Sequence, residues 1–289
     1  MSKVELANAA TVKKLMGNDV FSKKSLGPNI IIDNTVCPPM AEAVADKDTG
    51  VLEIGPGIGV LTRELGAVAK RVVTVELDRS LEPILAQTLC DLENVKVIFG
   101  DAMKLDLHAL IAENFADCSR VSVCANLPYY ITSPIIMKLL ESRLPIEKIV
   151  VMVQKEAAER LCAEVSSREA GAVTVAVNYY AEGEILFGVG RDSFMPPPKV
   201  DSAVISLSVR KQPPVAVPDE DKFFALIKAC FAQRRKTLLN TVSSTLHIEK
   251  SALAECLNEL SLPETVRAEK LTMEQLAALS QTLHEKQIY

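Results

Sequence analysis

The sequence lacks the features that define several large classes of protein. No apolar run reaches the 18 or so uninterrupted residues that a membrane-spanning helix needs. The first 16 residues lack the ordered charged, apolar and cleavage regions of a secretion signal. No internal repeat and no low-complexity tract interrupts the 289 residues. We therefore expect a cytoplasmic protein without a membrane segment, long enough for one large and one small domain.

The cysteines form no pattern that points to a metal or to a disulfide framework. All seven are scattered along the chain, their number is odd, and no C-x-x-C pair occurs. In a cytoplasmic protein such thiols are expected to be reduced and mostly buried. The sequence predicts no metal site.

Positive charge is in overall deficit, which taken alone argues against nucleic acid as a partner. The net charge is −5, whereas phosphate binding needs positive surface. The average conceals two basic clusters, one in the first two dozen residues, which includes Lys23 and Lys24, and one at Arg234, Arg235 and Lys236. Local basic patches on an acidic protein remain compatible with RNA binding.

Short β-branched runs alternate with helical stretches through the middle of the chain. Strands are expected at 51–54, 71–76, 95–99, 121–125 and 149–154, and helices near 34–46, 61–69, 81–89, 105–115 and 134–141. This alternation is typical of βαβ units, which build a parallel sheet covered by helices on both faces. Ligands of such sheets bind at the carboxyl ends of the strands.

The remainder of the chain changes character twice. After a helix over 155–165, two long β-rich runs at 172–189 and 200–209 suit an antiparallel edge pair of the sheet. A proline-rich linker then leads to apolar residues at helical spacing. The predicted organisation is a basic N-terminal arm at 1–32, an α/β domain at 33–210, a linker at 211–218 and a small all-helical domain at 219–289.

A glycine-rich turn, Glu53 to Gly59, follows the first expected strand and opens a helix. Such a turn lets backbone approach a ligand closely, and a dinucleotide is the first candidate. Two details oppose it, because the third glycine of that fingerprint belongs where Val60 stands and because Pro56 removes a backbone N–H. S-adenosylmethionine carries no phosphate and tolerates that loss. A nicotinamide-dependent oxidoreductase is disfavoured further because no obvious hydride-transfer histidine emerges.

Polar residues stand at the ends of the next three strands. Glu76 lies about 20 residues beyond Gly55, where a carboxylate in folds of this type accepts hydrogen bonds from ribose hydroxyls. Asp101 and Asn126 end the third and fourth strands. Each alone could be a solvated or turn residue, but together with Gly55 and Gly57 they favour a cofactor site at one edge of the sheet.

Asn126 also opens the stretch Asn-Leu-Pro-Tyr-Tyr, which ends at Tyr130. The stretch offers an amide side chain, a backbone locked by proline and one or two aromatic faces. These groups suit the holding of a flat ring that bears an amino group, as adenine does. An ordinary turn with tyrosines packed at a strand end is the alternative.

Three stretches in this order, Glu53 to Gly59, Asn126 to Tyr130 and Phe194 to Ala203, resemble the rRNA adenine dimethyltransferases. Within that family the chain is similar to the bacterial enzymes that dimethylate two adjacent adenosines near the 3′ end of 16S rRNA. The likeness is strong over 24–209 and continues at 231–238. It implies a Rossmann-like class I methyltransferase sheet, S-adenosylmethionine as methyl donor and a role in rRNA processing during ribosome biogenesis.

The resemblance also implies roles for single residues. Contacts to S-adenosylmethionine are implied for Asn29, Ile31, Gly55, Glu76, Asp101 and Asn126. The Asn126 side-chain oxygen and the Leu127 carbonyl are expected to accept the two N6 hydrogens of adenine, and Pro128 to fix the turn. Tyr129 and Phe194 are expected to stack on the two faces of the base. The sequence departs from the family at Pro28 and Ile30, where glutamine and phenylalanine are usual.

A helix around 233–237 is expected to present Arg234, Arg235 and Lys236 to RNA, with Lys199 and the N-terminal arm extending the basic surface. A solvated charged face is the alternative. Two other functions stay open: a large-subunit (23S) rRNA methyltransferase of the antibiotic-resistance type, and a binding protein that checks ribosome assembly. A monomer bound to 16S rRNA in the immature small subunit is the expected state.

Overall fold

The structure is a computed structural model that describes residues 6–17 and 29–288. The chain forms two compact units. The first runs to Ala158 and resumes over Glu184–Val209, and the second comprises Glu159–Gly183 and the chain from Arg210 onward. The segment 159–183, expected within the α/β domain, therefore groups with the C-terminal helices.

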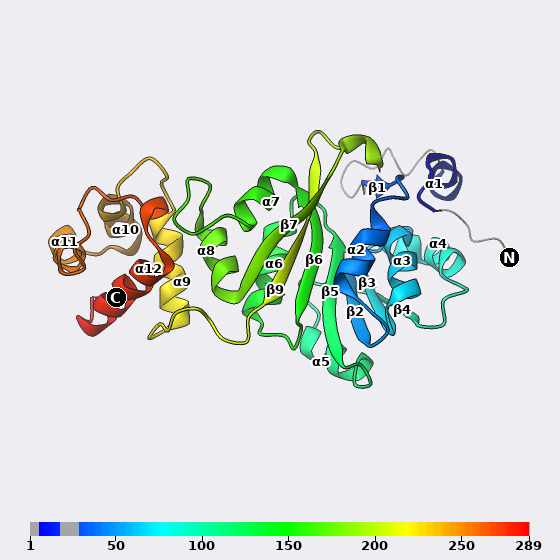
Figure 1. The fold of residues 1–289 in the computed structure, drawn as a ribbon, viewed down its shortest axis with the longest axis horizontal. Coiled ribbons are helices and arrows are strands. Elements are labelled where there is room, and N and C mark those ends of the chain that lie inside the picture. Colours follow the sequence, from blue (N-terminus) through cyan, green and yellow to red (C-terminus); the bar gives the residue numbers. More distant parts are fainter. Residues whose placement is uncertain (1–5, 18–28, 289) are drawn as a thin grey trace. The chain divides into compact units, whose positions relative to one another are not determined.

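A seven-stranded sheet with the order β4-β3-β2-β5-β6-β9-β7 organises the first unit (Figure 1). The strands are β2 (Thr49–Ile54), β3 (Arg71–Glu76), β4 (Val95–Phe99), β5 (Arg120–Asn126), β6 (Lys148–Gln154), β7 (Ala181–Val189) and β9 (Ser202–Val209). β2 to β6 run parallel, and β9 pairs antiparallel with β6. The predicted mostly parallel sheet with an antiparallel edge is confirmed.

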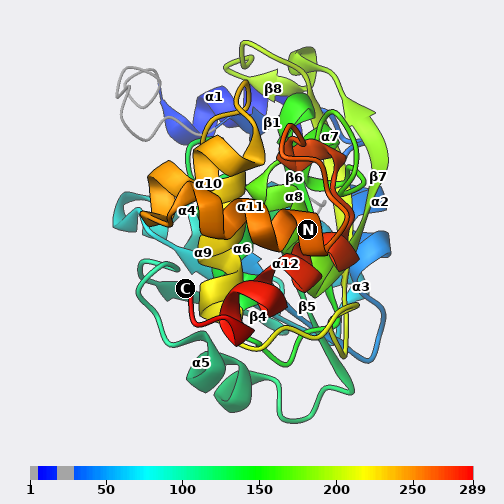
Figure 2. The same cartoon turned by 90° about the vertical axis from the view of Figure 1, so that its left-hand side faces the viewer.

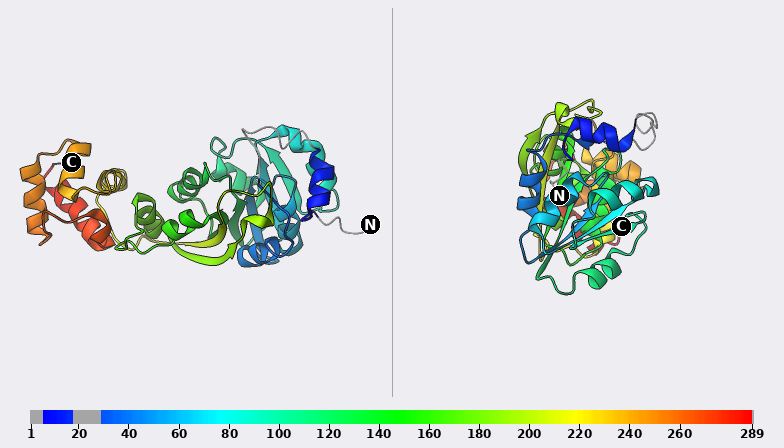
Figure 3. Two further views of the ribbon diagram at one scale, coloured as in Figure 1. Left: turned by 90° about the horizontal axis from the view of Figure 1, so that it is seen from above. Right: turned by 90° about the vertical axis from the view of Figure 1, so that its right-hand side faces the viewer.

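Helices cover both faces of this sheet (Figure 3). They are α2 (Cys37–Val44), α3 (Val60–Val68), α4 (Glu82–Thr88), α5 (Leu107–Asn114), α6 (Thr132–Glu141) and α7 (Lys155–Leu161). α2 precedes the first parallel strand, α3 to α6 connect successive parallel strands, as βαβ units require, and α7 follows β6. Their starts follow local chemistry: Asp106, for example, caps α5 by accepting from the Ala109 N–H at 3.0 Å. Because helices cover both faces, a ligand-binding site is expected at the carboxyl ends of the strands.

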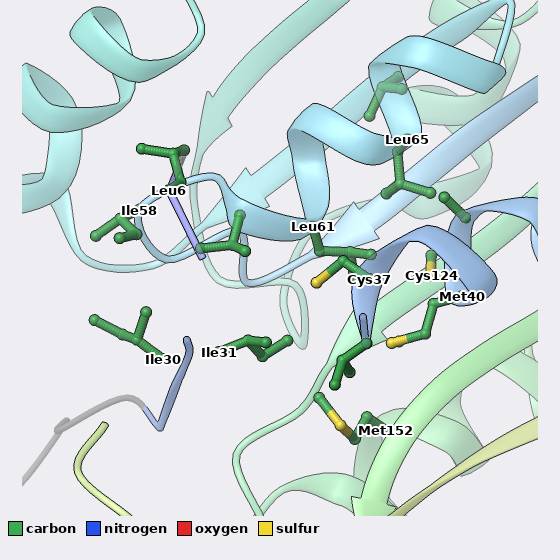
Figure 4. Packing of buried hydrophobic residues seen from close by; sticks show 14 of the residues in the cluster. Leu6, Ile30, Ile31, Cys37, Met40, Ile58, Leu61, Leu65, Cys124 and Met152 are labelled. Carbon is green, nitrogen blue, oxygen red and sulfur yellow. The ribbon is translucent and has the colours of Figure 1, made fainter. Parts of the chain in front are cut away.

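A second, two-stranded sheet joins distant parts of the first unit. β1 (Ile30–Ile31) pairs antiparallel with β8 (Phe194–Met195), with Ile31 opposite Phe194. Both strands belong to a buried apolar cluster that also contains residues of α1 (Ala9–Met16) and of the glycine turn. Figure 4 shows Leu6, Ile30 and Ile58 in the same part of this cluster. This pairing escaped the sequence analysis, because two-residue strands carry no periodicity.

The second unit is helical, as Figure 2 shows for its C-terminal part. Its helices are α8 (Ala172–Tyr180), α9 (Glu220–Cys230), α10 (Leu238–Leu246), α11 (Lys250–Glu259) and α12 (Met273–Glu285). Tyr179 and Tyr180 of α8 pack against Phe223 and Phe224 of α9, with ring centroids 5.2–5.6 Å apart. None of the helices in the described ranges is long and apolar enough to cross a membrane.

Two predicted elements of this unit are wrong. The run 172–180 was expected to be strand because it is rich in valine, threonine and tyrosine, but it is helix α8. Thr174 accepts from the Gly171 N–H at 3.0 Å at its start, and aromatic packing on α9 outweighs the β propensity. The stretch 233–237 is a turn between α9 and α10, not a helix, and Thr237 caps α10.

A carboxyl group lies buried near the end of β2, at the first residue of the glycine turn. Glu53 is 1% exposed, and its Oε2 accepts from the Thr62 hydroxyl at 2.7 Å. Its Oε1 has no hydrogen-bond partner among the described residues. Burial raises the pKa of Glu53 from 4.5 to about 7, and the bond from Thr62 offsets only part of this rise.

This burial predicts a pH-dependent stability. Because the folded protein holds the Glu53 proton more tightly than the unfolded chain does, the free energy of unfolding should fall as the pH rises from 4.5 to about 7. The contribution of this group is about 3 kcal/mol in full. Glu53→Gln should remove that part of the pH profile, measured by chemical denaturation between pH 5 and pH 8. Glu42→Gln, at an exposed position of α2, is the control. Superimposable profiles for wild type and Glu53→Gln would contradict the assignment.

Candidate functional site

The glycine turn presents bare backbone to open space. Gly55 and Gly57 have φ angles of 72° and 58°, in the left-handed region that favours glycine. A Cβ added to either would meet nothing within 4 Å. The Gly55 N–H donates to the Val75 carbonyl at 2.9 Å, which holds the turn against β3. A ligand can therefore approach this backbone closely at the carboxyl edge of the sheet.

Glu76, at the end of β3, supports the glycine turn directly. Its Oε2 accepts from the Gly57 N–H at 3.2 Å, and its Oε1 accepts from the Asp78 N–H at 2.8 Å. The residue is 7% exposed. Burial raises its pKa, and backbone hydrogen bonds from Asp78, Gly57 and Leu77 oppose that rise. Each carboxylate oxygen retains a lone pair for a further donor, such as a hydroxyl of a ligand.

Asp101 lies beside Glu76, as the order of strand ends predicts. The Gly100 N–H donates to the Glu76 carbonyl at 2.8 Å, which ties the end of β4 to that of β3. Asp101 Oδ1 accepts from the Met103 N–H at 2.9 Å. Hydrogen bonds to Glu76 from Gly57 and from Gly100, the residue before Asp101, therefore bring three predicted cofactor residues, Gly57, Glu76 and Asp101, to one edge of the sheet.

Two apolar side chains at this edge escaped the sequence analysis. Leu77 follows Glu76 and is 56% exposed, and Met103, two residues beyond Asp101, is 39% exposed. A large apolar side chain that stays exposed just after a strand-end carboxylate offers a flat ligand an apolar face. Both could have been predicted from the sequence, because each follows a strand-end carboxylate within two residues.

Asn126 is oriented by the segment that enters β1. Its Nδ2 donates to the Asn29 carbonyl at 3.2 Å. Because the amide nitrogen is directed to this carbonyl, the amide oxygen points away from it and can accept from another group. Asn29 and Asn126, which are 97 positions apart, thus meet in the structure.

The residues after Asn126 form a fixed turn. The Pro128 carbonyl accepts from the Ile131 N–H at 3.1 Å and from the Thr132 hydroxyl at 3.3 Å, which leads the chain into α6. The Tyr129 hydroxyl lies 2.8 Å from Ser202 Oγ, and this contact fixes the edge of its half-buried ring. Tyr130 is 67% exposed, so it is not a core residue.

Phe194 differs in position from the other predicted site residues. It is 2% exposed and belongs to the same apolar cluster as its β8–β1 partner Ile31, which is also 2% exposed. In this structure the ring offers almost no surface to a base and packs as an edge-strand core residue. Ile30, where the family has phenylalanine, is buried there as well, and Pro28 lies outside the described residues.

The predicted RNA-binding residues divide between the two units. Arg234, Arg235 and Lys236 are exposed on the turn between α9 and α10 of the second unit, whereas Lys199 is exposed in the first. The Arg234 guanidinium donates to the Arg168 carbonyl at 2.8 Å. Lys23 and Lys24 lie outside the described residues. Within the described ranges no group of three histidine, cysteine or acidic residues could hold a metal ion.

The sequence matches known proteins over almost its whole length. The model of the family described as ribosomal RNA adenine dimethylase matches residues 21–285. A relative from Geobacillus thermodenitrificans, named ribosomal RNA small subunit methyltransferase A, is 48% identical over 284 residues, which cover 96% of this chain and 97% of the relative. A relative of the same name from Bacillus licheniformis is 46% identical over 286 residues, with 97% and 98% covered.

Solved structures extend the likeness to the fold. A dimethyladenosine transferase from Plasmodium falciparum superimposes with a TM-score of 0.71 at 28% identity, over 87% of this chain and 96% of the other. The 23S rRNA methyltransferase ErmE gives a TM-score of 0.66 at 25% identity, over 89% and 100%. The chain belongs to the ribosomal RNA adenine dimethylase family, whose members are enzymes that use S-adenosylmethionine.

Proposed function

We propose that the chain dimethylates the N6 amino groups of two adjacent adenosines near the 3′ end of 16S rRNA, as a cytoplasmic monomer acting on the immature small subunit. The orientation of the Asn126 amide by the Asn29 carbonyl, beside the glycine turn, carries this proposal. The bacterial relatives are named as methyltransferases of the small-subunit ribosomal RNA, which supports 16S rRNA over 23S rRNA as the substrate.

The edge of the sheet fits S-adenosylmethionine. Open space faces the backbone of Gly55 and Gly57, and the Glu76 carboxylate has acceptor capacity for ribose hydroxyls. Leu77 and Met103 present apolar surface to the adenine ring, next to Asp101. When bound, S-adenosylmethionine supplies a methyl group on a sulfonium centre that is already strongly electrophilic.

The acceptor side has to place and polarise a poor nucleophile, because the lone pair of adenine N6 is delocalised into the ring. In our proposal Asn126 Oδ1 and the Leu127 carbonyl accept the two N6 hydrogens, which favours a pyramidal nitrogen with an available lone pair. The Pro128 turn holds both acceptors, and the Tyr129 ring, fixed through Ser202, stacks on the base. For the second face, stacking by Phe194 would require its ring to leave the apolar cluster.

Removal of the oriented amide tests this assignment. Asn126→Ala should lower kcat about 100- to 1,000-fold, the range observed when one positioned hydrogen-bonding group is lost. Binding of S-adenosylhomocysteine, measured by calorimetry, should change little and serves as the internal control. Turnover close to that of the wild type would rule out Asn126 as an acceptor.

The substrate is tested by mapping the modified base. Incubation with labelled S-adenosylmethionine and immature small subunits should place two methyl groups on each of two adjacent adenosines near the 3′ end of 16S rRNA. Naked 23S rRNA is the parallel substrate, because the likeness to ErmE makes it the competing choice. Label in 23S rRNA alone would overturn the proposed substrate, and tight binding without label would favour an assembly-checking role.

The basic turn of the second unit is proposed to contact rRNA phosphates. If it does, affinity for the subunit should fall steeply with salt, because phosphate contacts release counterions. Arg234→Ala with Arg235→Ala should reduce the slope of log K against log salt by about one to two. The control is Lys47→Ala. Lys47 is an exposed lysine just before β2, at the amino end of the strands and away from the carboxyl edge. An unchanged slope in the double variant would make the turn a solvated surface.

A further inference from the structure

Lys138 of α6 makes an unusual set of contacts for a lysine. Its Nζ lies 3.0 Å from the Ala102 carbonyl, 2.7 Å from the Met103 carbonyl and 3.2 Å from the Leu105 carbonyl. An ammonium group has three donors, and three backbone acceptors match them here. The side chain is half-buried and reaches 33–36 positions back along the chain.

The three carbonyls belong to the loop that Asp101 begins. This loop turns on itself, since the Asp101 carbonyl accepts from the Lys104 N–H at 2.8 Å and from the Leu105 N–H at 3.0 Å. Asp101 Oδ1 accepts from the Met103 N–H, so the side chain takes part in the same turn. The turn points the carbonyls of Ala102, Met103 and Leu105 to one side, and backbone carbonyls that are removed from water require hydrogen-bond donors. The Lys138 ammonium group is that donor.

The helix that carries Lys138 is firmly held in the core. α6 is anchored in the core by Ile135, Ile136 and Leu139, which are 3%, 0% and 2% exposed. The start of α6 is hydrogen-bonded to the Pro128 carbonyl, which belongs to the stretch from Asn126 to Tyr130. Lys138 therefore binds the Asp101 loop from a rigid helix, at a position about two turns after the start of α6.

We propose that Lys138 is a positioning residue for the cofactor site: it holds the loop of Asp101 in the conformation that binds S-adenosylmethionine. The inference rests on the cofactor role proposed for Asp101. Lys138 itself does not touch the reacting atoms, and its effect passes through the loop. Its loss should weaken cofactor binding and leave the chemical step intact once the cofactor is saturating.

Lys138→Met tests this, because methionine fills a similar volume without donors. The dissociation constant for S-adenosylhomocysteine should rise about tenfold, which corresponds to the loss of hydrogen bonds from a charged group. KM for S-adenosylmethionine should rise in parallel, with kcat and the KM for rRNA close to wild type. Lys96→Met is the matched control: Lys96 binds Asn114 Oδ1 at 2.8 Å, away from the Asp101 loop, and its substitution should leave both constants unchanged.

A double-mutant cycle with Asp101→Ala separates the possible failures. Asp101→Ala alone should weaken cofactor binding, and Lys138→Met should add little in that background, because both act through one loop. If Asp101→Ala alone leaves binding unchanged, the cofactor role of Asp101 fails, and this inference fails with it. If Asp101→Ala weakens binding but Lys138→Met does not, or if the two effects add fully, the cofactor role stands and the positioning role of Lys138 is overturned.

A second variant covers the case in which Lys138→Met does not fold. Lys138→Gln keeps two donors on a shorter, uncharged side chain and should also raise the dissociation constant, by less than methionine does. Circular dichroism and thermal unfolding confirm the folded state of each variant before titration. A folded Lys138→Gln protein with wild-type affinity for S-adenosylhomocysteine would overturn the proposal.

Discussion

The carboxyl edge of the sheet is organised by the hydrogen bonds of Glu76. Its side chain accepts from the Gly57 and Asp78 N–H groups, and its backbone carbonyl accepts from Gly100. One residue thus fixes the glycine turn after β2, its own turn after β3 and the loop after β4. Parallel strands place their ends side by side, but they do not set the loops that follow. Glu76 sets them, and the same carboxylate keeps lone pairs for the ribose hydroxyls that we propose as its ligand.

A second constraint, from another part of the chain, fixes the stretch from Asn126 to Tyr130. Asn126 ends β5, yet the orientation of its amide depends on the carbonyl of Asn29, at the entry to β1. Pro128 and Thr132 then carry the chain into α6 without a break. The residues that we propose for the cofactor and those that we propose for the acceptor base are therefore held by different contacts, and Lys138 connects the two groups through the loop of Asp101.

The sequence predicts those parts of the fold in which local pattern and tertiary burial agree. β3 lies at the predicted residues because it is buried over five of its six positions and polar residues mark its ends. β4 is an edge strand and only partly buried, but its β-branched run ends at Gly100 and was predicted as well. α8 was missed because its valines and tyrosines favour a strand until α9 packs on them. The turn at 233–237 was missed because its charges suit a helix surface equally well. The strand-end residues of the site were predictable from spacing, whereas Lys138 was not: a lone lysine on a helix carries no signal until the carbonyls that it meets are placed by the fold.

The pairing of β1 with β8 bears on the order in which the protein matures on the ribosome. β1 has β8 as its strand partner, and the Ile32 N–H and the Asp33 carboxylate also bind Ser193. Domains form from the N-terminus during synthesis, but this segment cannot dock until the chain has emerged beyond Met195. The central strands can assemble earlier, so the amide of Asn126 acquires its orientation as a late event. A nascent chain would hold the paired central strands before the Asn126 amide is oriented by the Asn29 carbonyl.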